Sequence, residues 1–338
     1  MQRFVRLFAL GIAACVVAAA PSAAEDTYPS RPVRLVVGFG AGGPTDIPAR
    51  FIADKLGNML GQRVIVENKM GAAGMLATRD VLAQPADGYN LFLCTHFEAI
   101  NTVLYKNPGF KLSDIAPVSL IAKYYYGVAL SNSIPANTLE ELMTYAKAHP
   151  GEVSYATLGA GSAQEIMARQ FEKLAGISMN RIPFRSGSQI MPDLIAGRID
   201  VIPADPPVLL PLVAANQIRP VVVLGVNRLA SLPDTPTTVE LGYSGMVMEN
   251  WYGLLAPAGL PPDVAKKLEA AALIAIKSAA VQEHMKKGEI SGTLNASEFA
   301  ARIAKDAAYW RPMLPKLGIT AVDGPAAAPS SAPAAPSR

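Results

Sequence analysis

Short apolar runs that are typical of buried strands alternate with helix-like patterns along most of the chain, and this alternation restricts the fold more than any other feature. It predicts a mostly parallel sheet covered by helices, because parallel neighbours need a long crossover, which a helix supplies. One series occupies residues 33–94, and a second begins near residue 128. About 300 residues beyond an N-terminal leader exceed one ordinary domain, so two lobes with separate cores are expected.

The expected elements are short and regularly spaced. Helix 139–149 should begin at Asn137 or Thr138, and helix 164–175 should end at Gly176. The chain returns to a strand at Trp251, and periodicity alone does not assign the two helices that follow it to either lobe. The residues after Val322 are almost all Ala, Pro and Ser, which predicts a disordered tail over 323–338. The expected strands are 33–37, 64–67, 91–94, 128–130, 153–156, 199–202 and 221–224, and the expected helices are 47–60, 76–83, 139–149, 164–175, 264–279 and 296–310.

Residues 1–24 have the order of a secretory signal peptide. Two arginines precede an apolar run at 7–20, and a pattern of small residues ending at Ala24 follows. The run is short for a membrane span, so we expect export and cleavage after Ala24 rather than a retained anchor. Cys15 also resembles a lipoprotein processing site, but the apolar continuation to residue 20 argues against lipidation.

The mature chain is expected to be nearly neutral. Removal of residues 1–24 takes away two of the 30 basic residues and none of the 27 acidic ones, which leaves a net charge of +1. This balance gives no reason to expect nucleic acid or an anionic lipid surface as a partner. Cys94 is then the only cysteine, so we expect neither an internal disulfide nor a thiolate metal site.

A glycine cluster at 38–46 follows the first expected strand and precedes the first expected helix. Glycines there let backbone amides approach an anion at a helix N-terminus, which makes the cluster a candidate ligand loop. Three of the glycines also satisfy the dinucleotide fingerprint, and Glu67 stands where a ribose-binding acid would lie. A helix that starts at Thr45 or Asp46, after Pro44, favours the ligand loop over a dinucleotide site. A purely structural turn is the remaining alternative.

Two segments of the second series are candidates for the opposite wall of a cleft. The turn Gly159-Ala160-Gly161-Ser162 again joins a strand to a helix, and it either contacts a ligand or is an ordinary connection with Ser162 as N-cap. The segment 183–188 contains Arg185, which is either a bidentate partner for a carboxylate or a solvated surface arginine. Two glycine turns, one in each lobe, would hold one ligand from both sides.

The sequence gives little indication of a catalytic site. The three histidines, His96, His149 and His284, lack the spacing of metal ligands, and neither a nucleophile elbow nor a Walker loop occurs. His96 and Glu98 follow the strand that ends at Cys94 and would suit an acid–base pair. A polar lining for a binding cleft is the simpler interpretation, and we favour it.

These residues together resemble the Bug family, the periplasmic receptors of tripartite tricarboxylate transporters. Each motif is modest, but their order and spacing over nearly the whole mature chain are specific. The motifs are Tyr28-Pro29-Ser30-Arg31-Pro32, Phe39-x-x-Gly42-Gly43-Pro44-Thr45-Asp46, Val66-Glu67-Asn68-Lys69-x-Gly71-Ala72-x-Gly74, Asp87-Gly88-Tyr89, Ala116-Pro117-Val118-Ser119-Leu120, Pro183-Phe184-Arg185, Leu194-x-x-Gly197-x-x-Asp200, Leu232-Pro233-Asp234-x-Pro236-Thr237 and Trp251-Tyr252-Gly253-Leu254-Leu255-Ala256-Pro257-Ala258-Gly259.

The resemblance implies an α/β fold with two lobes, of the type II periplasmic-binding-protein kind, in which each lobe is a mixed sheet flanked by helices. The chain is expected to cross between lobes near Tyr126 and near 223–225. Residues 25–125 and 226–322 would form the first lobe and residues 126–225 the second. The resemblance also places the ligand loops after the strands, and the resulting candidate binding residues are Phe39, Gly40, Ala41, Gly43, Thr45, Asp46, Thr95, His96, Gly159, Ala160, Gly161, Ser162, Arg185, Ser186 and Asp205.

The chain departs from the family pattern near the expected pocket. His96, Phe97 and Glu98 replace small hydroxyl-bearing residues after the third strand, and Phe184 replaces the usual tyrosine. Asp205 lies one place after the usual acidic position. The identity of the substrate therefore does not transfer from the family.

The expected protein is an exported periplasmic solute-binding receptor with no enzymatic activity, cofactor or metal. It should close two lobes about a hinge around a small carboxylate, either a compact di- or tricarboxylate or an aromatic acid. Its partners would be the large and small membrane subunits of a tripartite tricarboxylate-type transporter. The alternatives are a ligand-sensing subunit for a signalling kinase and an exported enzyme that acts on a carboxylic acid.

Overall fold

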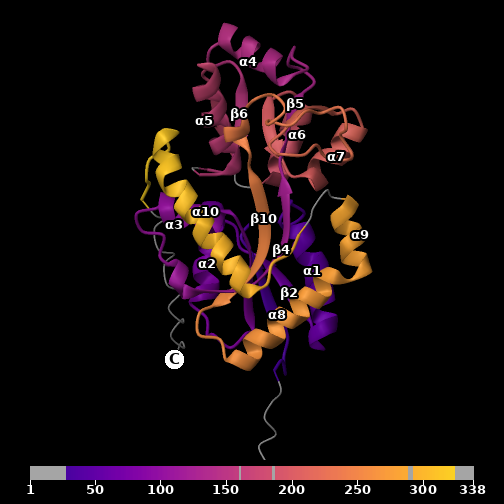
Figure 1. The fold of residues 1–338 in the computed structure, drawn as a ribbon, viewed down its shortest axis with the longest axis vertical. Coiled ribbons are helices and arrows are strands. Elements are labelled where there is room, and N and C mark those ends of the chain that lie inside the picture. The colour runs from indigo at the N-terminus through magenta and orange to yellow at the C-terminus, as the bar shows by residue number, and fades with distance from the viewer. Residues whose placement is uncertain (1–27, 160, 185–186, 288–291, 324–338) are drawn as a thin grey trace, which may run out of the picture.

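The computed structural model describes residues 28–159, 161–184, 187–287 and 292–323. The expected signal peptide, Cys15 and the tail beyond residue 323 lie outside these ranges. Two five-stranded sheets form the framework, with strand orders β2-β1-β3-β10-β4 and β7-β6-β8-β5-β9. The sheets lie one above the other along the long axis of the molecule, each with its own helices (Figure 1). This two-lobed α/β architecture is the expected one.

The first sheet is built mainly from the N-terminal third of the chain. β1 is almost wholly buried and pairs in parallel with both β2 and β3, as expected for an apolar run covered on two faces. β10 is antiparallel to β3 and β4, so the sheet is mixed. The strands are β1 (Val33–Val37), β2 (Val64–Asn68), β3 (Asn90–Thr95), β4 (Ile115–Tyr125) and β10 (Glu249–Pro257).

The C-terminal helices pack in the lobe of the first sheet. Periodicity alone did not assign them to either lobe. α8 packs against α1, and α10, the yellow helix in Figure 1, packs against α3 and β4. The Trp251 indole on β10 donates a hydrogen bond to Asp306 on α10, with 2.7 Å between Nε1 and Oδ2. The helices of this lobe are α1 (Asp46–Leu60), α2 (Met75–Leu82), α3 (Phe97–Leu104), α8 (Pro262–Lys277), α9 (Ala279–Lys287) and α10 (Ala296–Lys316).

The second sheet follows the pattern expected from the second series. Thr138 begins α4 and Ser162 begins α5, each accepting a hydrogen bond from the backbone N–H three residues on. Gly176 ends α5 with φ of 64°, a left-handed conformation that suits glycine. The elements are β5 (Gly127–Ser131), β6 (Ser154–Thr157), β7 (Asn180–Pro183), β8 (Val201–Ala204), β9 (Ile218–Val223), α4 (Leu139–Ala148), α5 (Ala163–Ala175), α6 (Ile190–Ile195) and α7 (Pro206–Ala214).

The alternation of patterns predicted mostly parallel sheets, yet each sheet contains, next to one edge strand, a strand that is antiparallel to both of its neighbours. β10 runs against β3 and β4, and β5 runs against β8 and β9. The reason is the route of the chain, since β5 and β10 are the strands at which it has just passed from one sheet to the other. Local periodicity does not contain this information.

The two sheets are joined at two neighbouring points. β4 leads into β5 through Tyr126 alone. On the return path, the Leu224 amide donates to the Tyr126 carbonyl at 2.8 Å, and the Met248 amide donates to the Leu224 carbonyl at 2.9 Å. The two connections are therefore hydrogen-bonded to each other, as the paired strands of a hinge would be.

The segment between β9 and β10 stays with the second sheet. The Val223 amide donates to the Pro236 carbonyl at 2.8 Å, and the Thr238 amide donates to the Val223 carbonyl at 2.9 Å. We therefore propose that the second crossing lies at Met248, later in the chain than residues 223–225. Two leucines of the segment pack into the core of the second sheet, Leu229 and Leu232.

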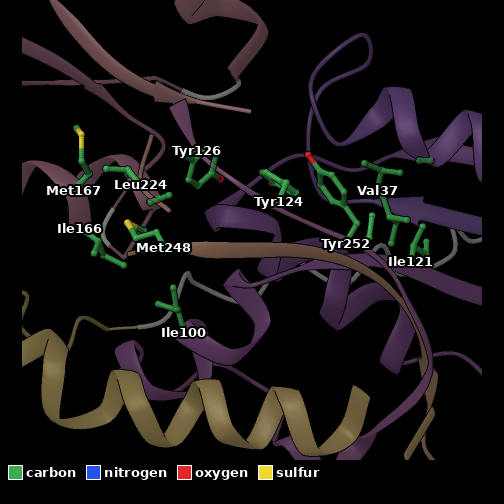
Figure 2. Close-up of a cluster of buried hydrophobic side chains, with 14 of the residues drawn as sticks. Val37, Ile100, Ile121, Tyr124, Tyr126, Ile166, Met167, Leu224, Met248 and Tyr252 are labelled. Carbon is green, nitrogen blue, oxygen red and sulfur yellow. The ribbon is translucent and has the colours of Figure 1, made fainter. Parts of the chain in front are cut away.

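A continuous apolar cluster extends from one sheet to the other. Figure 2 shows Tyr124, Tyr126 and Tyr252 between side chains of the first lobe, such as Ile121, and side chains of the second lobe, such as Met167. The lobes thus meet through packed side chains around the crossings. Among the described residues, no helix is both long and apolar enough to cross a membrane.

Candidate functional site

A cavity lies between the two sheets and receives side chains from both lobes. The cavity is narrow, because the volume within which the centre of a water molecule can lie is only about 50 Å³. Among the described residues, neither lysine nor arginine lines it. The lining residues are Phe39, Pro44, Thr45, Thr95, His96, Phe97, Tyr124, Tyr126, Leu158, Gln164, Gly187, Ile190, Met191, Ile202, Pro203, Ala204, Asp205 and Val208.

Some of the sequence-predicted binding residues meet at this cavity and others do not. Its lining includes five of them, and the remaining described ones stand in the same loops without lining it. Ala160, Arg185 and Ser186 lie outside the described residues. The five that line the cavity are Phe39, Thr45, Thr95, His96 and Asp205, and those that do not are Gly40, Ala41, Gly43, Asp46, Gly159, Gly161 and Ser162.

Asp46 holds the first glycine loop in place. Its side chain is 2% exposed and accepts hydrogen bonds from the Gly42 amide, the Arg50 guanidinium and the Asn68 amide group, each at 2.8 Å. Burial disfavours the charged form, but these bonds hold the pKa of Asp46 below its ordinary value. Asn68 also donates to the Phe39 carbonyl at 2.9 Å. Asp46 therefore positions Phe39 and Thr45 rather than reaching the cavity itself.

Glu67 is engaged away from the glycine loop. Its carboxylate accepts two hydrogen bonds from Arg34, at 2.5 and 3.0 Å. The hydrogen bond from Arg34 lowers the pKa of Glu67, so this exposed group is an ion-pair partner. This arrangement favours the ligand-loop interpretation over the dinucleotide alternative, which assigned Glu67 to a ribose.

The glycine turn of the second lobe touches the first lobe directly. A side chain at Gly161 would place Cβ 2.5 Å from the Leu104 side chain and 2.9 Å from the Ile100 side chain, both on α3. Ser162 faces inward, where its hydroxyl caps α5 and lies 2.8 Å from the Thr157 hydroxyl. The turn thus provides a close contact between lobes, for which the absence of a side chain is required.

His96 is buried at the start of α3 and has no hydrogen-bond partner on either ring nitrogen. Its ring stacks on Phe97 with centroids 4.5 Å apart and meets the edge of Tyr126 at 6.4 Å. Burial lowers the pKa of His96 to about 3, so the ring is neutral. A neutral imidazole offers the cavity one donor and one acceptor.

Glu98 does not form the acid–base pair with His96 that the sequence left open. It accepts hydrogen bonds from the Thr95 amide at 2.7 Å and the Thr78 hydroxyl at 3.3 Å, and it is absent from the cavity lining. Burial raises the pKa of Glu98 to about 8. Glu98 therefore supports the turn between β3 and α3 and leaves His96 to the cavity.

Asp205 connects the lobes through a cluster of tyrosines. Tyr252 on β10 donates to Asp205, with 2.5 Å between the hydroxyl oxygen and Oδ2, and the same hydroxyl lies 3.1 Å from the Pro44 carbonyl. Burial raises the pKa of Asp205 to about 6, although hydrogen bonds from Tyr252, Tyr124 and Tyr126 favour its charged form. Tyr124 stacks on Tyr252 with centroids 5.0 Å apart, and Figure 2 shows the three tyrosines in a row.

Sequence reasoning missed several lining residues. Tyr124 and Tyr126 belong to a run of three tyrosines at the expected crossing, a signal that was available because a crossing borders the cleft. Gln164 stands in the first turn of α5, directly after the candidate loop. Ile190, Met191 and the other apolar lining residues carry no such signal, since apolar residues at helix spacing usually face a core.

The comparisons with known proteins agree with this geometry. A family model described as "Tripartite tricarboxylate transporter family receptor" matches residues 48–319. Protein BugT of Bordetella pertussis is 32% identical over 84% of this chain and 87% of its own length. The solved periplasmic binding protein BugD superposes with a TM-score of 0.83 at 30% identity, over 87% of this chain and 99% of that one.

A further solved structure, R. palustris Rpa4515 with adipate, has a TM-score of 0.82 at 27% identity, over 86% of this chain and 98% of its own. The sequence match spans most of the chain, and the structural matches extend over both lobes. The chain therefore belongs to the Bug family of solute-binding receptors of tripartite tricarboxylate transporters.

Proposed function

We propose that this receptor captures a small carboxylate in the cavity between its lobes and delivers it to the large and small membrane subunits of a tripartite tricarboxylate-type transporter. The observation that carries the proposal is the cavity itself, which takes Thr45 and His96 from one lobe and Gln164 and Asp205 from the other. The adipate in the solved relative Rpa4515 supports a carboxylate as the ligand class. Export to the periplasm, with cleavage after Ala24, is part of the proposal.

Capture would proceed by closure about the hinge at Tyr126 and Met248. The contacts that join the lobes in the present structure include the hydrogen bond between Tyr252 and Asp205 and the packing of Gly161 against Leu104. Opening would break both contacts and expose the cavity to solvent. A ligand that bridges the lobes binds the closed state better than the open one and shifts the population toward it.

Arg185 is the proposed cationic partner of the carboxylate. It stands two positions before Gly187, which lines the cavity, in a loop that the family resemblance assigns to the ligand. A guanidinium can grip a carboxylate through two parallel hydrogen bonds. Among the described lining residues no other cation competes for this role.

Thermal unfolding of the mature protein in the presence of candidate ligands tests the proposal. The panel contains citrate, succinate, adipate, phthalate isomers and benzoate beside their amides or methyl esters, with sugars and NAD as unrelated compounds. A ligand that binds only the folded protein stabilises it by about 2.7 kcal/mol at a hundredfold excess over Kd. We expect stabilisation by an acid and its loss in the amide or ester. Stabilisation by a neutral sugar or NAD, with every acid silent, would refute the carboxylate class.

Two further measurements separate the receptor from its alternatives. Mass spectrometry of the bound acid after long incubation should recover it chemically unchanged, whereas an exported enzyme would convert it. Reconstituted membrane subunits should take up the acid only when the receptor is present. Uptake that does not depend on the receptor would contradict the delivery role.

A further inference from the structure

Two polar side chains that line the cavity contain buried atoms without a hydrogen-bond partner. Both ring nitrogens of His96 and the side-chain oxygen of Gln164 are unpaired, although the residues are only 4% and 7% exposed. Folded proteins rarely leave buried polar atoms unpaired, because desolvation then goes uncompensated. His96 belongs to the first lobe and Gln164 to the second, so the two unpaired groups stand on both walls of one cavity.

Two other polar groups of the lining have partners within the protein. Asp205 accepts from Tyr252, and the Thr95 hydroxyl accepts from the Phe97 amide at 3.2 Å. Among the described lining residues, the fully buried side-chain atoms without a partner belong to His96 and Gln164. This is the pattern of a site whose ligand supplies the missing partners.

The chemistry of the unpaired atoms restricts that ligand. A neutral imidazole has one donor and one acceptor nitrogen, and the Gln164 oxygen is an acceptor. A carboxylate has acceptors alone, so it can pair with the imidazole N–H but with neither of the two acceptors. Whichever nitrogen of His96 carries the proton, the other still requires a donor. A plain carboxylate thus leaves part of the site unsatisfied.

The rest of the cavity wall suits an apolar body. Leu158, Ile190 and Met191 face it from the second lobe. Phe39 and Phe97 face it from the first, with ring centroids 5.6 Å apart. A ligand with several charged groups would place charge against these apolar side chains. An aromatic ring or a short hydrocarbon chain would instead replace water at this wall of the cavity.

We propose that the ligand is a carboxylic acid that also carries a hydroxyl or N–H donor on an apolar body, and that His96 and Gln164 select it by pairing with that donor. This inference rests on the proposed function, because it refines the carboxylate class. It shifts the expected ligand from di- or tricarboxylates in general, among which succinate has acceptors alone, toward hydroxy or amino acids with fewer charges.

Matched acids test the inference by titration calorimetry at pH 7. The first set is benzoate, its three hydroxy isomers and the corresponding methoxy isomers, and the second is succinate with its hydroxylated analogue malate. A hydroxyl donates and accepts, whereas a methoxy group only accepts. We expect at least one hydroxy acid to bind about tenfold or more tightly than both its unsubstituted and its methoxy counterpart, because sites built to pair a hydroxyl reject analogues that lack it.

Two variants assign the preference to its residues. Gln164→Met and His96→Phe keep the size of each side chain and remove its hydrogen-bonding atoms. The ratio of affinities for the hydroxy acid and its methoxy counterpart should fall toward one in each variant. Thermal unfolding without ligand should show no loss of stability, since each change removes a buried unpaired polar group.

The outcomes distinguish this inference from the function on which it rests. If acids bind without preference for a donor, the inference fails and the carboxylate receptor stands. If no acid in any set binds, both fail. A preference that survives in both variants, or a marked loss of stability in Gln164→Met without ligand, would show that the donor pairs elsewhere or that Gln164 has a structural partner, and would overturn the assignment.

Discussion

The hydrogen bond between Asp205 and Tyr252 predicts that stability depends on pH through one buried carboxyl group. Asp205 belongs to the second lobe and Tyr252 to the first, so this hydrogen bond joins the two lobes. Burial raises its pKa from the ordinary 3.8 to about 6 in the folded protein. The perturbation that isolates this group is Asp205→Asn, which keeps the shape and removes the titration.

The sign follows from proton binding. Between about pH 4 and pH 6 the folded protein holds a proton on Asp205 that the unfolded chain has released, so stability falls as pH rises through this interval. The contribution is fully present below the unfolded pKa and is lost as pH rises through the folded one. Each pKa unit corresponds to about 1.4 kcal/mol, so the rise from 3.8 to about 6 corresponds to about 3 kcal/mol.

The assay is urea unfolding of wild type and Asp205→Asn at half-unit steps from pH 4 to pH 7.5. The difference in unfolding free energy between the two proteins should move by about 2.4 kcal/mol in favour of the variant between pH 4 and pH 7, and other titrating groups cancel in this difference. Asp54→Asn, which removes a carboxyl group that is 65% exposed on α1, is the control. A difference that stays constant with pH for Asp205→Asn would refute the reasoning.

Three further predictions concern ligand capture. Arg185→Ala should weaken binding of the stabilising acid by about 1.5 to 3 kcal/mol if the guanidinium makes a charge-assisted contact. An unchanged Kd would favour the alternative in which Arg185 is a solvated surface residue. Gly161→Ala should reduce both affinity and stability, because its Cβ would meet Leu104 of the other lobe. Gly151 also has a positive φ but has open space around it, so Gly151→Ala should reduce stability alone. Equal effects of the two variants on affinity would contradict the contact between lobes. Small-angle scattering should show a smaller radius of gyration with saturating acid than without it, and identical profiles would contradict hinge closure.

Much of the local structure could be predicted from the sequence, because its signals are local. The apolar run at 33–37 forms β1 with those bounds, Thr138 and Ser162 begin their helices, and Gly176 ends α5. Strand periodicity, capping side chains and left-handed glycines each depend on residues that are a few positions apart in the sequence. The chain length and the second series of elements predicted two lobes, and the family motifs added the type of fold.

The sequence predicted the binding site less completely than it predicted the local structure. The sequence indicated which loops follow the strands, and Phe39, Thr45, Thr95, His96 and Asp205 line the cavity accordingly. It did not indicate which way the side chains within a loop turn. Asp46 and Ser162 have the residue types of ligand contacts, yet both are taken up by neighbouring backbone and side-chain groups.

Tertiary structure alone decided the contacts between residues distant in sequence. Asp205 meets Tyr252 across 47 residues of sequence, and His96 and Gln164 remain unpaired because no neighbour in either lobe offers a matching atom. The raised pKa of one group and the unmet hydrogen bonds of the others arise from desolvation, which depends on everything that surrounds an atom. A sequence determines which groups are available to a site, and only the packed fold determines which of them are deprived of water and left for a ligand.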